Sequence, residues 1–187
     1  MATTVKICGV RDKATAKFCF AHGADFVGLV FAASRRQITL GVAQQIVQEI
    51  PGRYVAVVNS PDAGALLEII QKIRPYAIQH HGEPMCEWLE LSHGQGIAAI
   101  ATTLDPRADI VLLDGPIPGQ GQERKWERPP WPKPLWLAGG LSPKNVREVV
   151  RTLKPDGVDV SSGVESQGNK DWRLIAAFIE EAKSWKE

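Results

Sequence analysis

Short apolar runs, rich in β-branched residues, recur along the whole chain and alternate with amphipathic stretches. We predict eight strands from these runs, at residues 5–8, 26–31, 54–58, 77–80, 97–101, 110–114, 135–139 and 157–161. Several runs are apolar throughout, which is typical of strands covered on both faces. Strands of this kind belong to parallel sheets that carry helices on the outside.

The amphipathic stretches between the runs predict helices at residues 11–23, 40–52, 63–75, 142–155 and 170–185. Ser142 followed by Pro143 is a typical helix start. Strands alternating with helices define an α/β protein, and right-handed crossovers favour a closed (β/α)8 TIM barrel. An open doubly wound sheet remains the alternative, because spacing alone does not separate the two.

Only the segment TTLDPRAD separates the fifth and sixth predicted strands, so we expect the fifth helix to be shortened or missing. The length of 187 residues suits a single barrel domain over residues 1–187. We therefore expect one domain whose wall is thinly covered at this point.

Composition narrows the function classes. A net charge of +1 gives no overall field for nucleic acid or an anionic membrane, and no apolar run is long enough to span a bilayer. The first ten residues lack the apolar core of a signal peptide. Three cysteines at no metal-ligand spacing, Cys8, Cys19 and Cys86, fit a reducing compartment. We expect a cytoplasmic protein without nucleic-acid or membrane partners and without a metal.

Two residues at predicted strand ends can exchange protons. Lys6 and Cys8 alternate on one face of the first strand, and that face should point into the barrel. A nearby ammonium would favour the thiolate, so Cys8 is either a small core residue or a base. Asp114 ends the sixth strand and either caps the next turn or acts as an acid.

The loops after the seventh and eighth strands are rich in small residues. Gly139 and Gly140 follow the seventh strand, and Ser162 and Gly163 follow the eighth. Small residues let backbone N–H groups approach an anion, and these two loops form the usual phosphate site of a TIM barrel. They are a predicted phosphate site or simply tight turns.

Further polar side chains should face the same end of the barrel. A buried Asp159 needs a partner, for which Lys6 is the candidate, and it either neutralises that lysine or contacts substrate. Arg35 and Arg36 follow the second strand and either hold a carboxylate or form part of the solvated surface. On the fourth strand Gln79 and His81 should point inward, while His80 points toward the helices.

Taken in order, these segments resemble the phosphoribosylanthranilate isomerase family over nearly the whole chain. KICGV resembles the opening motif of the family, and GLVF with SRR resembles its second strand and arginine loop. Further matches are IQHHGEP on the fourth strand, LLDG on the sixth, LAGGLSPKNV on the seventh and VDVSSGVE with GNKD on the eighth.

The resemblance implies a barrel enzyme that uses no cofactor and no metal. It implies the Amadori rearrangement of N-(5′-phosphoribosyl)anthranilate to 1-(2-carboxyphenylamino)-1-deoxy-D-ribulose 5-phosphate in tryptophan biosynthesis. In that reaction Asp114 would be the general acid and Cys8 the general base, and Arg36 would bind the anthranilate end. The partner would be a small phosphorylated substrate, contacted also by His81 and Asp159, and we expect a monomer or weak homodimer.

The chain departs from the family pattern in its trimmed fifth unit, in a slightly short loop after the eighth strand, and at two further places. His80 stands where the family usually has leucine, so it needs a hydrogen-bond partner or a partly wet site. The loop after Asp114 is shorter than usual and has Gln122 where a lysine is common, which bears on how this loop closes over substrate.

Two other functions remain open at this point. The histidine-pathway aminoaldose isomerase uses aspartates at the ends of strands one and five, whereas here those strands end in Cys8 and ATT, with no acid before Asp105. A binding barrel could instead retain the phosphate loops and have lost turnover.

Overall fold

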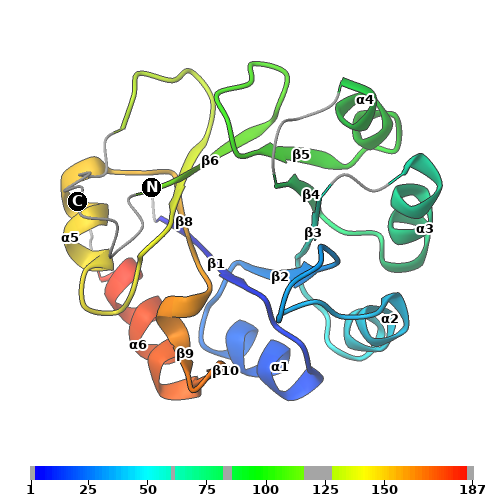
Figure 1. The fold of residues 1–187 in the computed structure, drawn as a ribbon. Coiled ribbons are helices and arrows are strands. Elements are labelled where there is room, and N and C mark those ends of the chain that lie inside the picture. The colour runs from blue at the N-terminus through cyan, green and yellow to red at the C-terminus, as the bar shows by residue number, and fades with distance from the viewer. Residues whose placement is uncertain (1–2, 60–61, 82–85, 116–127, 185–187) are drawn as a thin grey trace.

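The computed structural model describes residues 3–59, 62–81, 86–115 and 128–184. Eight strands form a closed barrel in the order β1 to β8, every neighbouring pair is parallel, and β8 returns beside β1. Figure 1 shows the strands as an inner ring with the helices around them. The predicted (β/α)8 barrel is confirmed, and the open doubly wound sheet is excluded.

The strands lie within one residue of their predicted bounds. They are β1 (Thr4–Cys8), β2 (Phe26–Val30), β3 (Tyr54–Val58), β4 (Ala77–His80), β5 (Ala98–Ala101), β6 (Ile110–Asp114), β7 (Leu135–Ala138) and β8 (Gly157–Val160). After β8 come the short 3-10 helix η1 (Ser162–Val164) and a hairpin of β9 (Glu165–Ser166) and β10 (Asn169–Lys170).

Six α-helices are present in the described residues. They are α1 (Lys13–Ala21), α2 (Leu40–Glu49), α3 (Ala63–Ile73), α4 (Cys86–Gly94), α5 (Val146–Leu153) and α6 (Trp172–Lys183). The carboxylates of Asp12, Asp62 and Asp171 each accept backbone N–H groups at a helix start, which fixes where α1, α3 and α6 begin. None of the helices is long and apolar enough to span a membrane in the part of the chain described.

Helix bounds follow the sequence less closely than strand bounds. Residues 102–109 between β5 and β6 contain no helix, as predicted, whereas α4 was not predicted. The expected start of α5 at Ser142 is wrong. Residues 143–145 form a turn instead, because the side chain of Asn145 accepts the N–H of Ser142 at 2.8 Å and ties the loop back on itself. The helix begins one residue after Asn145.

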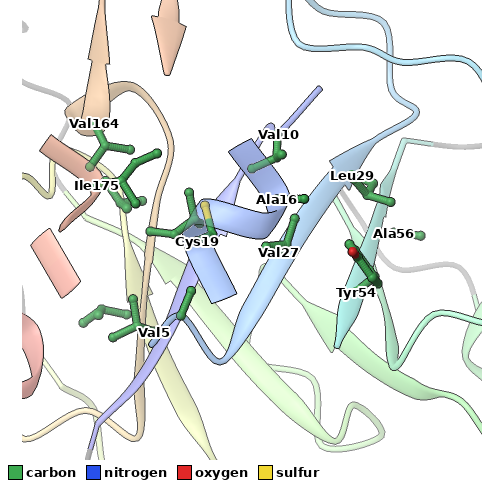
Figure 2. Close-up of a cluster of buried hydrophobic side chains, with 14 of the residues drawn as sticks. Val5, Val10, Ala16, Cys19, Val27, Leu29, Tyr54, Ala56, Val164 and Ile175 are labelled. Atoms are coloured by element: carbon green, nitrogen blue, oxygen red, sulfur yellow. The ribbon is translucent and has the colours of Figure 1, made fainter. Parts of the chain in front are cut away.

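Alternation along the strands divides the apolar residues between two cores. Outward side chains such as Val5, Val27 and Leu29 belong to the outer core, to which α1 contributes Ala16 and Cys19 (Figure 2). Inward side chains fill the barrel itself, among them Phe26, Val57, Ile100, Leu112 and Trp136. The carboxyl ends of the strands remain available for polar groups, as is usual in this fold.

One carboxylate joins the two described ends of the chain. Asp25, just before β2, accepts the backbone N–H of Val5 at 2.8 Å. The same oxygen receives the ammonium of Lys183, the last residue of α6, at 2.9 Å. The start of β1 and the end of the last helix therefore lie on either side of a single side chain.

Candidate active site

A cavity of about 410 Å³ opens at the carboxyl ends of the strands. Its volume lies in the range of small-molecule sites. All of the predicted site residues line it, although they come from six separate segments: Cys8, Arg36, His81, Asp114, Gly139, Gly140, Asp159, Ser162 and Gly163. The structure thus brings together the entire predicted set.

Lys6 lies beneath this cavity with no solvent exposure. Its ammonium donates to Asp159 Oδ1 at 2.9 Å, which is the predicted pairing, and to Gln79 Oε1 at 2.8 Å. Burial alone would lower the pKa of Lys6, but the charge of Asp159 and the nearby Cys8 raise it above its ordinary value. The lysine therefore remains a fixed positive charge inside the barrel.

Cys8 ends β1 at the floor of the cavity and is 8% exposed. Burial raises the pKa of its thiol, Lys6 and Lys170 oppose that rise, and Asp159 adds to it. Lys6 therefore favours the thiolate, as expected, although burial outweighs it and the net direction of the pKa shift is upward. The ion pair between Lys6 and Asp159 also brings a carboxylate near the thiol, and its negative charge adds to the larger effect of burial.

Gly28 provides the room that Cys8 and Lys6 occupy. It pairs with Cys8 across the β1–β2 ladder, and a Cβ at Gly28 would lie 2.9 Å from Cys8 Sγ and 3.2 Å from Lys6 Cε. Any other residue would have to displace the thiol or the lysine. No sequence pattern indicates this role, because it depends on which residue faces Gly28 across the ladder.

Asp114 ends β6 on the rim of the same cavity. Loss of hydration raises the pKa of its carboxyl group, and the charge of Asp159 adds to the rise, while His81 and Lys6 act against it. A carboxyl group with a raised pKa keeps its proton to a higher pH and is better suited to donate it. The shortened loop with Gln122 lies outside the described residues.

Arg36 is bound by an acidic residue that sequence analysis did not single out. Glu165 on β9 accepts Arg36 Nε at 2.6 Å and Nη2 at 3.0 Å, and it also pairs with Arg35 and Lys170. Burial disfavours the charged form of Glu165, but the hydrogen bonds from Arg36 and Lys170 lower its pKa to about 2. The VDVSSGVE and GNKD segments contained both residues, but only their meeting in the hairpin gives them a role.

The loops after β7 and β8 meet backbone to backbone. Gly139 and Gly140 have φ values of +75° and +66°, a region that favours glycine. A Cβ on Gly163 would lie 1.8 Å from the carbonyl oxygen of Leu141, so no side chain fits there. These glycines allow two loops to line one end of the cavity with main chain.

The fourth strand sends consecutive residues in opposite directions, as predicted. Gln79 and His81 line the cavity, whereas His80 packs edge-on against Trp88 of α4 with ring centroids 4.1 Å apart. Neither ring nitrogen of His80 has a hydrogen-bond partner among the described residues. A space of about 10 Å³ beside it, which Ser92 also lines, is close to the volume that one water needs.

The acid that the histidine-pathway reading requires is not in the cavity. Asp105 is 6% exposed and pairs with Arg107 at 2.7 Å in the loop between β5 and β6. It does not line the cavity. Among the described residues, no group of three or more His, Cys, Asp or Glu side chains is arranged to hold a metal ion.

Comparison with known families matches residues 5–181 to N-(5′-phosphoribosyl)anthranilate (PRA) isomerase. The N-(5′-phosphoribosyl)anthranilate isomerase of Streptococcus pneumoniae (strain Taiwan19F-14) is 37% identical over 191 residues, covering 97% of this chain and 96% of that protein. The phosphoribosyl anthranilate isomerase structure from Thermus thermophilus has a TM-score of 0.80 at 30% identity, covering 97% of this chain and 99% of that one.

A further solved relative carries a ligand. It is a phosphoribosyl anthranilate isomerase in complex with reduced 1-(o-carboxyphenylamino)-1-deoxyribulose 5-phosphate, with a TM-score of 0.78 at 30% identity over 98% of this chain and 100% of that one. The family match, the relatives and the barrel agree. The chain belongs to the phosphoribosylanthranilate isomerase family.

Proposed function

We propose that this chain catalyses the Amadori rearrangement of N-(5′-phosphoribosyl)anthranilate to 1-(2-carboxyphenylamino)-1-deoxy-D-ribulose 5-phosphate in tryptophan biosynthesis. Family membership over residues 5–181 supports the reaction. The observation that carries the mechanism is that Cys8 and Asp114, from strands on different sides of the barrel, line one cavity of about 410 Å³. That arrangement puts a base and an acid on either side of one bound sugar.

Asp114 acts first, as the general acid. It gives its proton to the ring oxygen of the ribose, the bond from that oxygen to C1′ breaks, and the anthranilate nitrogen supplies the electrons that form a protonated Schiff base. The raised pKa of Asp114 supports this role, because the carboxyl group must hold a proton before it can donate one.

Cys8 acts second, as the general base. The cationic Schiff base acidifies C2′, and the thiolate removes the C2′ proton to give an enolamine, which tautomerises to the ketone. The new positive charge of the Schiff base also favours the thiolate and so opposes the effect of burial. Lys6 and Lys170 support the ionised form from below and from the side.

Binding is divided between the two ends of the substrate. Arg36 binds the anthranilate carboxylate, and the main chain around Gly139, Gly140, Ser162 and Gly163 binds the phosphate. His81 and Asp159 contact the part of the substrate between them, supported by their position in the cavity lining. Phosphate binding far from the reacting carbons supplies orientation.

The remaining proposals concern the whole protein. Residues 1–187 form one domain, the protein is cytoplasmic, and it acts on a small phosphorylated molecule rather than on nucleic acid or a membrane. The near-neutral charge of +1 and the unpatterned cysteines support these proposals. We also propose a monomer or weak homodimer. One solved relative, from Thermotoga maritima, is described as monomers generated from a dimeric enzyme.

Steady-state turnover of phosphoribosylanthranilate tests the reaction. Wild-type protein should turn over readily, and Cys8→Ala and Asp114→Asn should each lower kcat by several orders of magnitude. Cys19→Ala is the matched control, since Cys19 is an equally buried thiol in the outer core and should leave turnover nearly unchanged. A folded wild type that binds product without turnover would instead identify a binding barrel.

The dependence of kcat/KM on pH tests the two roles. The pKa values of Asp114 and Cys8 are both raised, and turnover needs the pair to hold one proton, on Asp114, while Cys8 is ionised. The profile should therefore be level near neutrality and fall on both sides. The acid limb should lie above 3.8 and the alkaline limb above 9.0, the ordinary values of the two groups. An alkaline limb below 9.0 would contradict the role of Cys8 as a base with a raised pKa.

A further inference from the structure

Arg36 is held from two sides before any ligand arrives. Its aliphatic stem crosses Gly9, the residue after Cys8, so closely that a Cβ on Gly9 would lie 2.5 Å from Arg36 Cδ. Its guanidinium meets Glu165 in a two-point contact of 2.6 and 3.0 Å. Because both the stem and the planar guanidinium of Arg36 are held, the side chain has one orientation available.

Glu165 is itself fixed from the far side of the hairpin. Lys170 on β10 donates to Glu165 Oε1 at 2.9 Å and to the backbone carbonyl of Ser161 at 2.8 Å. The side chains of Glu165 and Lys170 are only 5% and 7% exposed. Ser161 in turn donates its hydroxyl to the carbonyl of Cys8 at 3.1 Å. A continuous set of contacts thus runs from the candidate base to the arginine.

The charges leave Arg36 able to attract an anion. One carboxylate, Glu165, faces the three cations Arg35, Arg36 and Lys170, so the cluster carries an excess of two positive charges. Within the described residues, Nη1 of Arg36 makes no hydrogen bond, and Arg36 lines the cavity. The contact with Glu165 therefore orients the guanidinium and leaves donors for a ligand.

We infer that Glu165 is a positioning residue that presents Arg36 to the carboxylate of the bound aromatic amine. This inference rests on the proposed function, in which Arg36 binds that carboxylate. It also means that one segment, residues 161–170, serves both ends of the substrate, since the candidate phosphate loop lies at its start and the support of Arg36 at its end. Specificity for a carboxylated aniline then depends on a residue that touches no ligand.

The test compares two ligands by calorimetry. Reduced 1-(o-carboxyphenylamino)-1-deoxyribulose 5-phosphate has the carboxylate, whereas ribulose 5-phosphate lacks it. Glu165→Gln should weaken the first ligand about tenfold, the value of one good charge-assisted contact, and change the second less than about twofold. In turnover the same variant should raise KM and leave kcat largely intact, because the contact is made equally in ground and transition states.

Three further variants separate positioning from a general structural role. Glu165→Gln should have no added effect in an Arg36→Met background, because the orienting contact is already lost. Arg35→Met is the matched control: Arg35 also pairs with Glu165, but its side chain is 58% exposed and lies outside the cavity lining, so affinity for the two ligands should fall equally and by less than about twofold. Glu165→Asp retains the charge next to Lys170 and should still weaken the carboxylated ligand, should Glu165→Gln fold poorly.

The inference is overturned by equal losses for both ligands, by unchanged affinity for the carboxylated ligand, or by additive effects of Glu165→Gln and Arg36→Met. Failure of the proposed function looks different. In that case wild-type protein binds the carboxylated ligand no better than ribulose 5-phosphate. Alternatively, neither wild-type protein nor any variant of Glu165 shows turnover.

Discussion

The walls formed by β1 and β4 bury polar side chains in opposite ways. Lys6 on β1 is fully buried and has partners at 2.8 and 2.9 Å, one of them Gln79 on β4. His80, the very next residue on β4, is 6% exposed and has no partner for either ring nitrogen among the described residues. A lysine must stay charged and so needs its partners, whereas a histidine can be buried as the neutral ring. The buried polar group on the inner face of the barrel therefore requires hydrogen-bond partners, whereas the one on the outer face can be buried without them.

Removing Lys6 should give the largest effect. Lys6→Met leaves Asp159 as an unpaired buried carboxylate, at a cost of about 3–5 kcal/mol in the free energy of unfolding measured by urea denaturation. Adding Asp159→Asn should restore much of that stability, because no buried charge remains. Turnover should stay low in both, since Cys8 then lacks its ammonium. If Lys6→Met alone were as stable as wild type, buried polar groups on the inner face would not need their partners.

Gly28 tests how tightly the inner face is filled. Gly28→Ala puts a methyl group 2.9 Å from Cys8 Sγ, which should cost about 1–3 kcal/mol and lower kcat by moving the thiol. Gly41→Ala adds the same methyl group in α2, where the nearest atom is 4.0 Å away, and should be neutral or stabilising by up to about 1 kcal/mol. Equal effects of the two substitutions would show that the space beside Cys8 does not matter.

His80→Leu should raise the free energy of unfolding, whereas the substitutions of Lys6 and Gly28 lower it. Burial, with His81 adding, lowers the pKa of His80 below its ordinary 6.5, so the unfolded chain binds more protons below that pH and wild-type stability falls as the solution is acidified. Leucine neither titrates nor carries unpaired nitrogens. The free energy of unfolding should therefore rise by about 1–2 kcal/mol, and by more at pH 5.5 than at pH 8. Urea unfolding at the two pH values measures it, and a gain independent of pH would exclude the titration of His80.

The smallest effect should come from the wall that lacks a helix. Lys133 donates to the carbonyl groups of Pro106 and Ala108 at 2.6 and 2.9 Å and ties the loop between β5 and β6 to the segment before β7. Lys133→Met should cost about 1 kcal/mol and speed hydrogen exchange in residues 102–109 only. Faster exchange around β1 as well would contradict an effect confined to the connection between β5 and β6.

The sequence predicts the parts of this molecule that depend on local pattern. Strand bounds are correct because the strands are short, mostly apolar runs, and alternation then correctly assigns Lys6, Gln79 and Asp159 to the inside. Helix α4 was not predicted, because its residues do not have the clear apolar spacing of an amphipathic helix. The start of α5 was misplaced because the side chain of Asn145 closes a turn that Ser142 and Pro143 did not reveal.

The remaining features depend on contacts between distant segments. Gly28 matters only because the ladder pairs it with Cys8, and Glu165 only because the hairpin brings it to Arg36 from 129 residues away. The direction of the pKa shift of Cys8 could not be predicted from its neighbour Lys6 alone. It follows from burial and from Asp159, which is 153 residues from Lys6 in the chain.

The carboxylate of Asp25 gives the barrel an unusual freedom of connectivity. Because it receives both Val5 and Lys183, a short linker could join the two ends without crossing the fold. New ends could then be opened between Thr103 and Leu104, two exposed residues in the connection without a helix. Such a circular permutant should fold with the same cavity and retain isomerase turnover. A permutant that fails to fold would show that the order of synthesis matters more than the closed ring of strands.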